Sequence, residues 1–341
     1  MSLGKLHIRL SLLLLAALLM VIGCDISQIT KPVHIYPVND VRDLPSRRVY
    51  GLRVPTYDGS GQAVHPDLLW LGDCGLTDGF ALAFTPYPDS DNAYENPSLL
   101  TSTNGLDFSE PVPGLNPIAQ RPSTGHNDDT DLVFDPITRE YRIYYLETCK
   151  PDSQNVILLS STDLISWTRQ CVLHYELRAQ ERFILSPAVI RAPDGQWRMY
   201  YVNARFYEGV SSVEYLTSRD GITWDKDAAH ASQLSWSGTS LPWHLDVFAG
   251  GGWYYSLVCG KIDRPDLYIA RSRDLETWEY LEVPILTPAS CGFECERVYR
   301  STGFVSAGSL IVYFSYMKPQ YRWGIGLYKI PLDQLWPLNK A

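Results

Sequence analysis

Positive charge and cysteine are both scarce in this sequence of 341 residues. The 29 Lys and Arg residues are outnumbered by 38 Asp and Glu, and the formal net charge of −9 excludes a nucleic-acid partner bound through a broad basic face. Seven cysteines are too few for a disulfide-dense miniprotein, and a hydrophobic content of 45% excludes a disordered or collagen-like chain. The sequence also lacks a Gly-rich phosphate loop, a nucleophile elbow and a zinc-protease helix motif.

The residues that are abundant favour short strands and a wet groove. The 24 Gly and 23 Pro residues interrupt long helices and favour strands joined by turns. The aromatic residues are 22 Tyr and 10 Trp against 10 Phe. Because Tyr and Trp carry a polar atom on a flat apolar body, they suit a hydrated groove better than a dry interior.

The first 23 residues have the layout of a secretory signal peptide. A start that contains Lys5, His7 and Arg9 is followed by an apolar run over residues 10–22, which is shorter than the roughly 20 residues of a membrane span. A short retained anchor is the alternative interpretation. The segment ends in Val-Ile-Gly-Cys24, which resembles the lipobox of bacterial lipoproteins. The resemblance implies lipid attachment at Cys24 and an exported protein anchored to a membrane of the cell envelope, facing the periplasm.

A short phrase recurs four times at near-constant spacing. Each copy starts with Ser, continues through a polar turn with Asn or Asp, and ends on an aromatic residue, and the copies begin at Ser102, Ser161, Ser218 and Ser272. This pattern is typical of a strand end, a turn and the start of the next strand. Four copies at such regular spacing predict a repeated unit of about 57 residues.

A second element lies upstream of each phrase and occurs five times. It is a short apolar strand entered through a polar residue, and its equivalent positions are Asp67, Asp131, Ala188, Asp246 and Gly303. Five units, each a small antiparallel sheet, predict an all-β, five-bladed β-propeller over residues 62–336. A β-sandwich is the rival fold, but it does not predict the long period. Residues 24–61 are interpreted as a tether and a segment that closes the ring.

Ring closure gives three acidic residues a reason to meet. The inner strands of a propeller surround one channel, so the side chains of Asp67, Asp131 and Asp246 are expected to converge there. Carboxyl groups gathered in a funnel repel and desolvate one another, and at least one pKa is expected to rise. Two acids with different pKa values are what glycoside hydrolysis needs, one to protonate the leaving oxygen and one to activate water.

The repeat number, the Asp of the first inner strand and the phrase Tyr94-Glu-Asn-Pro-Ser98 resemble the five-bladed glycoside hydrolases of families 43, 32, 62 and 68, with the related family 130. The resemblance implies that Asp67 is the general base. Where those families place a third-blade Asp, this chain has Ser186-Pro-Ala188, and in the fourth blade it has Asp246 instead of Glu. We therefore expect Asp246 to be the acid and Asp131 to tune the other two carboxyl groups.

Further polar residues are candidates for substrate binding. His126, Asn127 and Asp129 precede the second inner strand and either bind a ligand hydroxyl, bind a cation such as calcium, or are simply solvated. Trp243 and His244 precede Asp246 and are suited to stack on and hydrogen-bond to a sugar ring. The remaining candidates are Glu147, Arg205 and Arg300, and Arg300 is either an internal ion-pair partner or a grip on an anionic sugar.

The sequence as a whole predicts a glycosidase of the cell envelope. The expected reaction is cleavage of a glycosidic bond in an oligo- or polysaccharide by paired carboxylates, with inversion. The expected partners are carbohydrate and, through the lipid, the membrane; we expect a monomer, no metal ligands among the candidate residues and no cofactor, with a structural calcium in the channel as an open alternative. One rival function is a non-catalytic carbohydrate-binding or exopolysaccharide-associated lipoprotein, and another is a scaffold for protein interaction.

Overall fold

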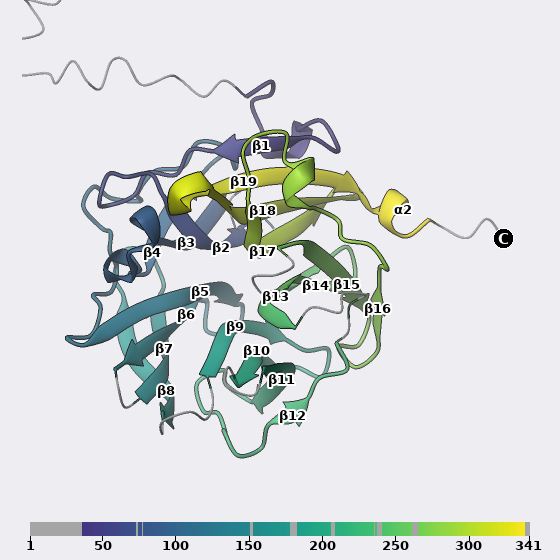
Figure 1. Cartoon of the computed structure of the whole chain (residues 1–341). Helices are drawn as coiled ribbons and strands as arrows, with labels where there is room; N and C mark the ends of the chain where they lie inside the picture. Colours follow the sequence, from purple (N-terminus) through teal and green to yellow (C-terminus); the bar gives the residue numbers. More distant parts are fainter. Residues whose placement is uncertain are drawn as a thin grey trace, which may run out of the picture. The chain divides into compact units, whose positions relative to one another are not determined.

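Five small antiparallel sheets contain nearly all the regular structure and are arranged as the blades of a propeller (Figure 1). The computed structural model describes residues 36–72, 74–76, 78–150, 153–177, 183–205, 209–234, 236, 241–260 and 265–337. The expected signal peptide over residues 1–23 and Cys24 lie outside these residues. From Val38 onward the described chain forms one unit. The five-bladed propeller predicted from the repeats is confirmed.

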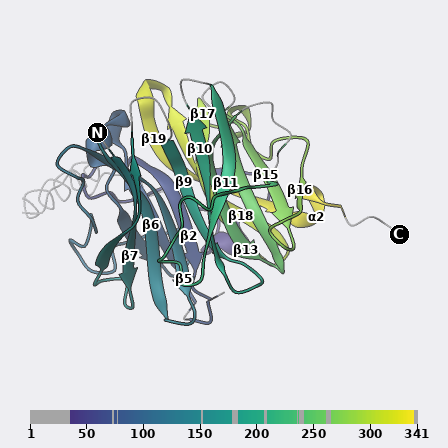
Figure 2. The same ribbon diagram turned by 90° about the horizontal axis from the view of Figure 1, so that it is seen from below.

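The inner strands surround the channel. They are β2 (Ala63–Trp70), β5 (Gly125–Asp135), β9 (Phe183–Arg191), β13 (Pro242–Gly250) and β17 (Arg297–Ser306). Each contacts the inner strands of both neighbouring blades, and β17 packs against β2 to complete the circle. Figure 2 views the blades after a turn of 90° and shows the inner strands running across the thickness of the ring.

The remaining strands extend each blade outward. The second strands are β3 (Phe80–Pro86), β6 (Glu140–Cys149), β10 (Trp197–Arg205), β14 (Trp253–Gly260) and β18 (Ser309–Lys318). The third strands are β4 (Ser98–Ser102), β7 (Ser153–Ser161), β11 (Val210–Ser218), β15 (Leu267–Ser272) and β19 (Arg322–Pro331). The outermost strands are β8 (Thr168–Glu176), β12 (His230–Ala231), β16 (Trp278–Tyr280) and β1 (Val49–Leu52).

Strand β1 belongs to the last blade although it comes first in the chain. It pairs antiparallel with β19, with Val49 opposite Tyr328, in the sheet β1-β19-β18-β17. The sheet of the first blade therefore has only β2, β3 and β4, and an isolated bridge between Thr101 and Ser109 follows its third strand. The segment 24–61 thus supplies a strand that joins the two ends of the propeller.

Helices are short in the described residues. They are the 3₁₀ helices η2 (Val41–Asp43), η3 (Pro88–Ser90), η4 (Asn92–Tyr94), η6 (Pro288–Ser290) and η7 (Pro319–Tyr321) and the single turn α2 (Leu332–Leu335). No helix in this part of the chain is long and apolar enough to cross a membrane.

The core lies between neighbouring blades. On β6, Tyr145 packs toward the first blade against Ala83, whereas the adjacent Tyr144 packs toward the third blade against Val189. Both tyrosines are completely buried, because successive side chains of a strand point to opposite faces and both faces of this sheet are covered. The aromatic second strands therefore hold the blades together.

The four repeated phrases form one kind of turn, which begins where the third strand of a blade ends. In the second blade, Asp163 Oδ1 accepts hydrogen bonds from the Ser161 hydroxyl and from the backbone N–H groups of Ile165 and Ser166. The same contacts recur at Asn104, Asp220 and Asp274. The sequence repeat thus encodes a side-chain cap that completes each of these turns.

Candidate functional site

The functional residues lie at or next to irregularities in the pairing of all five inner strands. The pairing of each inner strand with the second strand of its blade shifts register once. The shift lies between residues 64 and 67 in β2, 128 and 131 in β5, and 185 and 188 in β9. It lies between residues 242 and 244 in β13 and between 298 and 301 in β17. His65, Asp129 and Ser186 have positive φ angles of 53°, 51° and 51°. A bulge bends a strand and redirects its side chains, so the five blades turn polar residues into the channel together.

These residues form two layers, two positions apart along each strand. The outer layer consists of His65, Asp129, Ser186, His244 and Arg300. The deeper layer consists of Asp67, Asp131, Ala188, Asp246 and Thr302. The sequence analysis took Gly303 as the equivalent residue of the fifth blade. The structure gives Thr302 instead, because the Thr302 hydroxyl lies 3.4 Å from Asp67 Oδ1. The register shift in β17 moves the equivalence by one residue.

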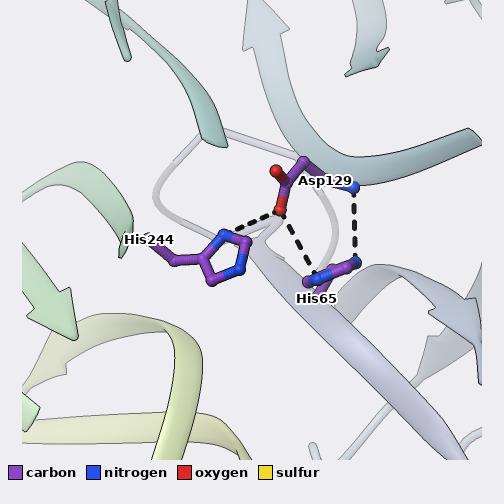
Figure 3. Close-up of side chains that lie close together, drawn as sticks. All are labelled: His65, Asp129 and His244. Atoms are coloured by element: carbon purple, nitrogen blue, oxygen red, sulfur yellow. Dashed lines mark hydrogen bonds and ion pairs between the residues drawn. The ribbon is translucent and has the colours of Figure 1, made fainter. Parts of the chain in front are cut away.

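Three residues of the outer layer form a compact group, here called the mouth cluster: His65, Asp129 and His244 (Figure 3). Asp129 Oδ1 lies 3.0 Å from His244 Nδ1 and 3.5 Å from His65 Nε2. The backbone N–H of Asp129 points at His65 Nδ1 at 3.3 Å, and the Ser186 hydroxyl lies 2.6 Å from His244 Nδ1. All three side chains of the cluster are buried.

Two residues of the mouth cluster, His65 and Asp129, have the protonation that a metal site requires. Burial lowers the pKa of His65 to about 3, so the imidazole is neutral at neutral pH. Burial alone would raise the pKa of Asp129, but His244, His65 and Arg300 outweigh it and hold that pKa well below the ordinary value. Neutral imidazole and ionised carboxylate are the forms of these side chains that bind metal ions.

Donor geometry also fits a metal ion. One ligand atom from each of the three residues lies within 4.8 Å of the others. His65 Nε2 and His244 Nε2 are buried and lack a hydrogen-bond partner among the described residues. Buried polar atoms normally have partners, so unpaired imidazole nitrogens indicate a missing ligand. Two imidazoles and a carboxylate are a common ligand set for divalent transition metals. The sequence analysis assigned no metal ligand. It left cation binding by the loop that contains Asp129 as one alternative, but it did not foresee that His65 and His244 join Asp129.

A cavity of about 270 Å³, here called the mouth pocket, opens over the cluster. Two further carboxyl groups line it. Burial, followed by repulsion from Asp128 and Asp129, raises the pKa of Glu95 well above its ordinary value. Burial also raises the pKa of Asp128, although His126 Nε2 lies 3.1 Å from Asp128 Oδ2 and opposes the shift. The mouth pocket therefore contains carboxyl groups that hold protons more tightly than exposed acids do.

Aromatic side chains form part of the wall of the mouth pocket. Trp243 Nε1 donates a hydrogen bond of 2.9 Å to the Tyr299 hydroxyl, and the Tyr299 ring meets the His244 ring edge-on at 4.3 Å. Tyr87 lies on the same wall. Flat amphipathic rings of this kind suit the faces and hydroxyls of a sugar.

The deeper layer brings together the three acids predicted to be catalytic, Asp67, Asp131 and Asp246, here called the acidic triad. One carboxylate oxygen of each lies within 4.8 Å of the others, and all three side chains are buried. Burial, followed by repulsion from Asp246, raises the pKa of Asp131 to about 7. Burial, followed by repulsion from Asp246 and Asp131, raises the pKa of Asp67 well above its usual range. Burial also raises the pKa of Asp246. The expected convergence and the expected rise in pKa are both present.

Spacing in the acidic triad does not match an inverting glycosidase. Carboxyl groups in inverting enzymes stand about 6.5–9.5 Å apart to leave room for water, and those in retaining enzymes about 5–5.5 Å apart. One oxygen of each triad acid lies within 4.8 Å of the others, so little room remains between them for water, and the triad lines a different cavity from the mouth pocket.

The predicted substrate-binding residues divide between the mouth pocket and other places. His126, Asp129, Trp243 and His244 line the mouth pocket. The Asn127 side chain is buried behind it and donates to Asn96 Oδ1. The remaining three lie elsewhere: Glu147 pairs with Arg169 at 2.6 Å on the second blade, Arg205 is exposed at the end of β10, and Arg300 is buried below Asp129.

Arg300 is therefore an internal ion-pair partner, one of the two alternatives left open by the sequence. Its Nη1 lies 3.3 Å from Asp129 Oδ1 and its Nη2 lies 3.9 Å from Asp131 Oδ1, so it stands between the mouth cluster and the acidic triad.

His65 and Glu95 are among the residues of the mouth pocket that the sequence analysis did not assign. His65 carried a detectable signal, because His65-Pro-Asp67 and His244-Leu-Asp246 show the same polar-x-acid pattern as Asp129-Thr-Asp131. Aligning the residue two positions before each triad acid would have found the mouth cluster. Glu95 lies in the phrase Tyr94–Ser98, but nothing in the repeat brings that loop to the channel.

Comparisons with known proteins agree on the fold and include one sugar deacetylase. No family model matches the chain. An A type blood N-acetyl-α-D-galactosamine deacetylase of Flavonifractor plautii is 26% identical over 298 residues, which cover 73% of this chain and 38% of that protein. The chain therefore spans well under half the length of this curated relative.

Solved structures with the same fold include an N-acetylgalactosamine deacetylase from F. plautii in complex with blood group B trisaccharide. It has a TM-score of 0.70 at 20% identity and covers 84% of this chain and 95% of its own. A thermostable family-43 glycoside hydrolase has a TM-score of 0.57 at 15% identity, and the match covers 79% of this chain and 89% of that one. The resemblance in fold to the five-bladed glycoside hydrolases is thus confirmed.

Proposed function

We propose that this protein hydrolyses the N-acetyl group of an amino sugar with the help of a divalent metal ion held by His65, Asp129 and His244. The observation that carries the proposal is the convergence of two buried histidines and an ionised Asp, with unpaired imidazole nitrogens, at a pocket lined by acids and aromatic rings. The similarity to an N-acetylgalactosamine deacetylase supports the same reaction class.

The metal would act as a Lewis acid toward the acyl oxygen when bound. His65 and Asp129 are already in the protonation states that bind a cation, so little proton release accompanies binding. Ser186 and Arg300 contact the cluster from behind and hold its side chains in place.

Proton transfer falls to the carboxyl groups of the mouth pocket. In the reaction, water adds to the acetyl carbon, the C–N bond breaks, acetate leaves and the amine takes up a proton. Glu95 and Asp128 have raised pKa values and line the pocket, so one is suited to accept the proton of water and one to donate to the amine. The aromatic wall formed by Trp243, Tyr299 and Tyr87 is suited to hold the sugar ring.

Cleavage of a glycosidic bond by the acidic triad is the second candidate, supported by the fold shared with family-43 enzymes and by the raised pKa values of Asp67 and Asp131. The close spacing of the triad is the reason for ranking it second. A carbohydrate-binding protein without catalysis is the third candidate.

For the cellular setting we retain the proposal from the sequence, an exported lipoprotein anchored through Cys24.

One assay separates the three. The purified chain is stripped with EDTA, reloaded with Mn²⁺ or Zn²⁺, and incubated with oligosaccharides that end in N-acetylgalactosamine or N-acetylglucosamine, while free acetate and new reducing ends are measured in parallel. Metal-dependent acetate release without new reducing ends is the expected result. New reducing ends that are insensitive to EDTA support glycoside hydrolysis instead, and binding of the sugar with neither product supports a lectin-like protein.

A further inference from the structure

A second cavity lies on the far side of the acidic triad from the mouth pocket. This distal chamber has a volume of about 370 Å³, within the range of cavities that hold small molecules. The three acids line it, and the inner strands that carry them continue away from the mouth into apolar residues. The mechanism proposed above uses neither the chamber nor the acidic triad.

Most of the chamber wall is apolar and aromatic. Trp70, Phe134, Phe248 and Phe304 contribute rings, and the rings of Trp70 and Phe304 lie 5.5 Å apart. Apart from the triad, the charged side chain that lines it is Arg191, whose Nε donates to the Gly195 carbonyl. Such a wall suits the carbon skeleton of a ligand.

Each acid of the triad has one oxygen held by a neighbour. The backbone N–H of Val189 donates to Asp131 Oδ2 at 3.0 Å, and the backbone N–H of Val247 donates to Asp246 Oδ1 at 2.7 Å. Thr302 approaches Asp67 Oδ1 at 3.4 Å. These contacts fix the carboxyl groups. Asp67 and Asp131 also hydrogen-bond to each other, whereas Asp246 Oδ2 is left for another partner.

The second oxygen of Asp246 is an unpaired polar atom in the interior. Asp246 is 2% exposed, and Asp246 Oδ2 has no hydrogen-bond partner among the described residues. The nearest cation, Arg300, is shared: it contacts Asp129 and the Pro187 carbonyl and lies 3.9 Å from Asp131. A buried carboxylate oxygen without a donor indicates that a cationic or donor ligand is missing.

We propose that the distal chamber binds a primary ammonium compound with an apolar body, the ammonium group resting on Asp67, Asp131 and Asp246. An ammonium group has three N–H donors, which matches three carboxyl oxygens gathered within 4.8 Å, and its positive charge favours the ionised form of these acids. The apolar wall accepts the carbon body, and the aromatic rings add favourable contact with a cation. A divalent metal fits less well, because a hard cation requires about six or more oxygen ligands and the wall supplies few beyond the triad.

Binding is measured by calorimetry on the purified, EDTA-treated protein with benzylamine and hexylamine as probes. Benzyl alcohol has the same shape without the charge, and benzoate carries the opposite charge. We expect saturable one-site binding of both amines and at least tenfold weaker binding of the alcohol and the acid. Equal binding of benzylamine and benzyl alcohol would show that the acids do not recognise the ligand and would overturn the proposal.

Asp246→Asn locates the site. This nearly isosteric change is expected to weaken benzylamine binding at least tenfold, whereas Asp163→Asn on the surface leaves it unchanged. Unchanged binding by the Asp246 variant overturns the proposal, as does tight binding of Ca²⁺ or Mn²⁺ that displaces the amine in wild type and is lost in that variant. The comparison of amine with alcohol uses the wild type alone, so it decides the question even if the variant does not fold.

Discussion

Arg300 Nη1 lies 3.3 Å from Asp129 Oδ1, and both side chains are almost completely buried. This pair joins the fifth blade to the second across the channel, and Arg300 stands between the mouth cluster and the acidic triad. Its two partners come from strands that are about as far apart in the ring as five blades allow.

Replacing Arg300 with Met should destabilise the protein by about 3–5 kcal/mol, because Asp129 and Asp131 both lose the buried cation that faces them. Urea unfolding measures the loss. Arg169→Met is the matched control: its partner Glu147 lies at 2.6 Å, but Arg169 is half exposed, so a cost below about 1 kcal/mol is expected. Equal costs at the two positions would contradict the role given to the buried pair.

Replacing either His65 or His244 with Ala should remove one equivalent of bound metal and reduce acetate release about 100-fold or more. Metal content is measured by elemental analysis after reloading, and activity by the acetate assay. His230, which is exposed on β12, supplies the control, and His230→Ala should retain both metal and activity. Full metal occupancy in both cluster variants would place the metal elsewhere.

The turn acids should give the protein part of its sensitivity to acid. Hydrogen bonds from the backbone N–H groups of Ser166 and Ile165 lower the pKa of Asp163 from 3.8 to about 2. Because the folded state binds this proton more weakly, the stabilisation is complete above about pH 4 and is lost as the pH falls toward 2. Asp163→Asn keeps the acceptor, as Asn104 does in the first blade, and should flatten this part of the curve.

Urea midpoints measured between pH 5 and pH 2.5 test the prediction about Asp163. Asp163→Ala removes the acceptor as well and should lower stability throughout the range, because the backbone N–H groups of the turn lose their partner. An Asn variant with the same pH slope as the wild type would show that Asp163 does not contribute to acid sensitivity.

Anchoring through Cys24 is tested by expressing the full chain in a bacterium. The wild type should sediment with membranes and require detergent for release, because attached acyl chains bury in the bilayer. Cys24→Ala should move the protein to the soluble fraction, and Cys74→Ala should not. Sedimentation of the Cys24 variant with membranes would refute lipid anchoring at this residue.

The sequence predicted the propeller because its signals are local and repeated. Each Ser-x-Asp or Ser-x-Asn phrase marks the end of a third strand, and the aromatic second strands are buried on both faces. Convergence of the acidic triad also followed from the repeat, since equivalent positions on inner strands must meet around one channel.

The mouth cluster was harder to predict because it is not one repeated residue type but a ring of different residue types, each on another blade. The shared repeat position of His65, Asp129 and His244 can be read from the sequence, but the bulges that turn these side chains toward one another cannot. Glu95 approaches from a loop outside the repeated strands, so periodicity carries no information about it. Because the sequence analysis considered only acidic residues as catalytic, it chose the acidic triad and missed the mouth cluster.

The pairing of β1 with β19 has a consequence for how the molecule is made. Residue 49 meets residue 328, so the last blade stays incomplete until both extremities of the propeller are present. Contacts between such remote positions form late, because the intervening chain must first be organised. During synthesis and folding, the last sheet is therefore expected to keep an unpaired edge at β19 until β1 pairs with it.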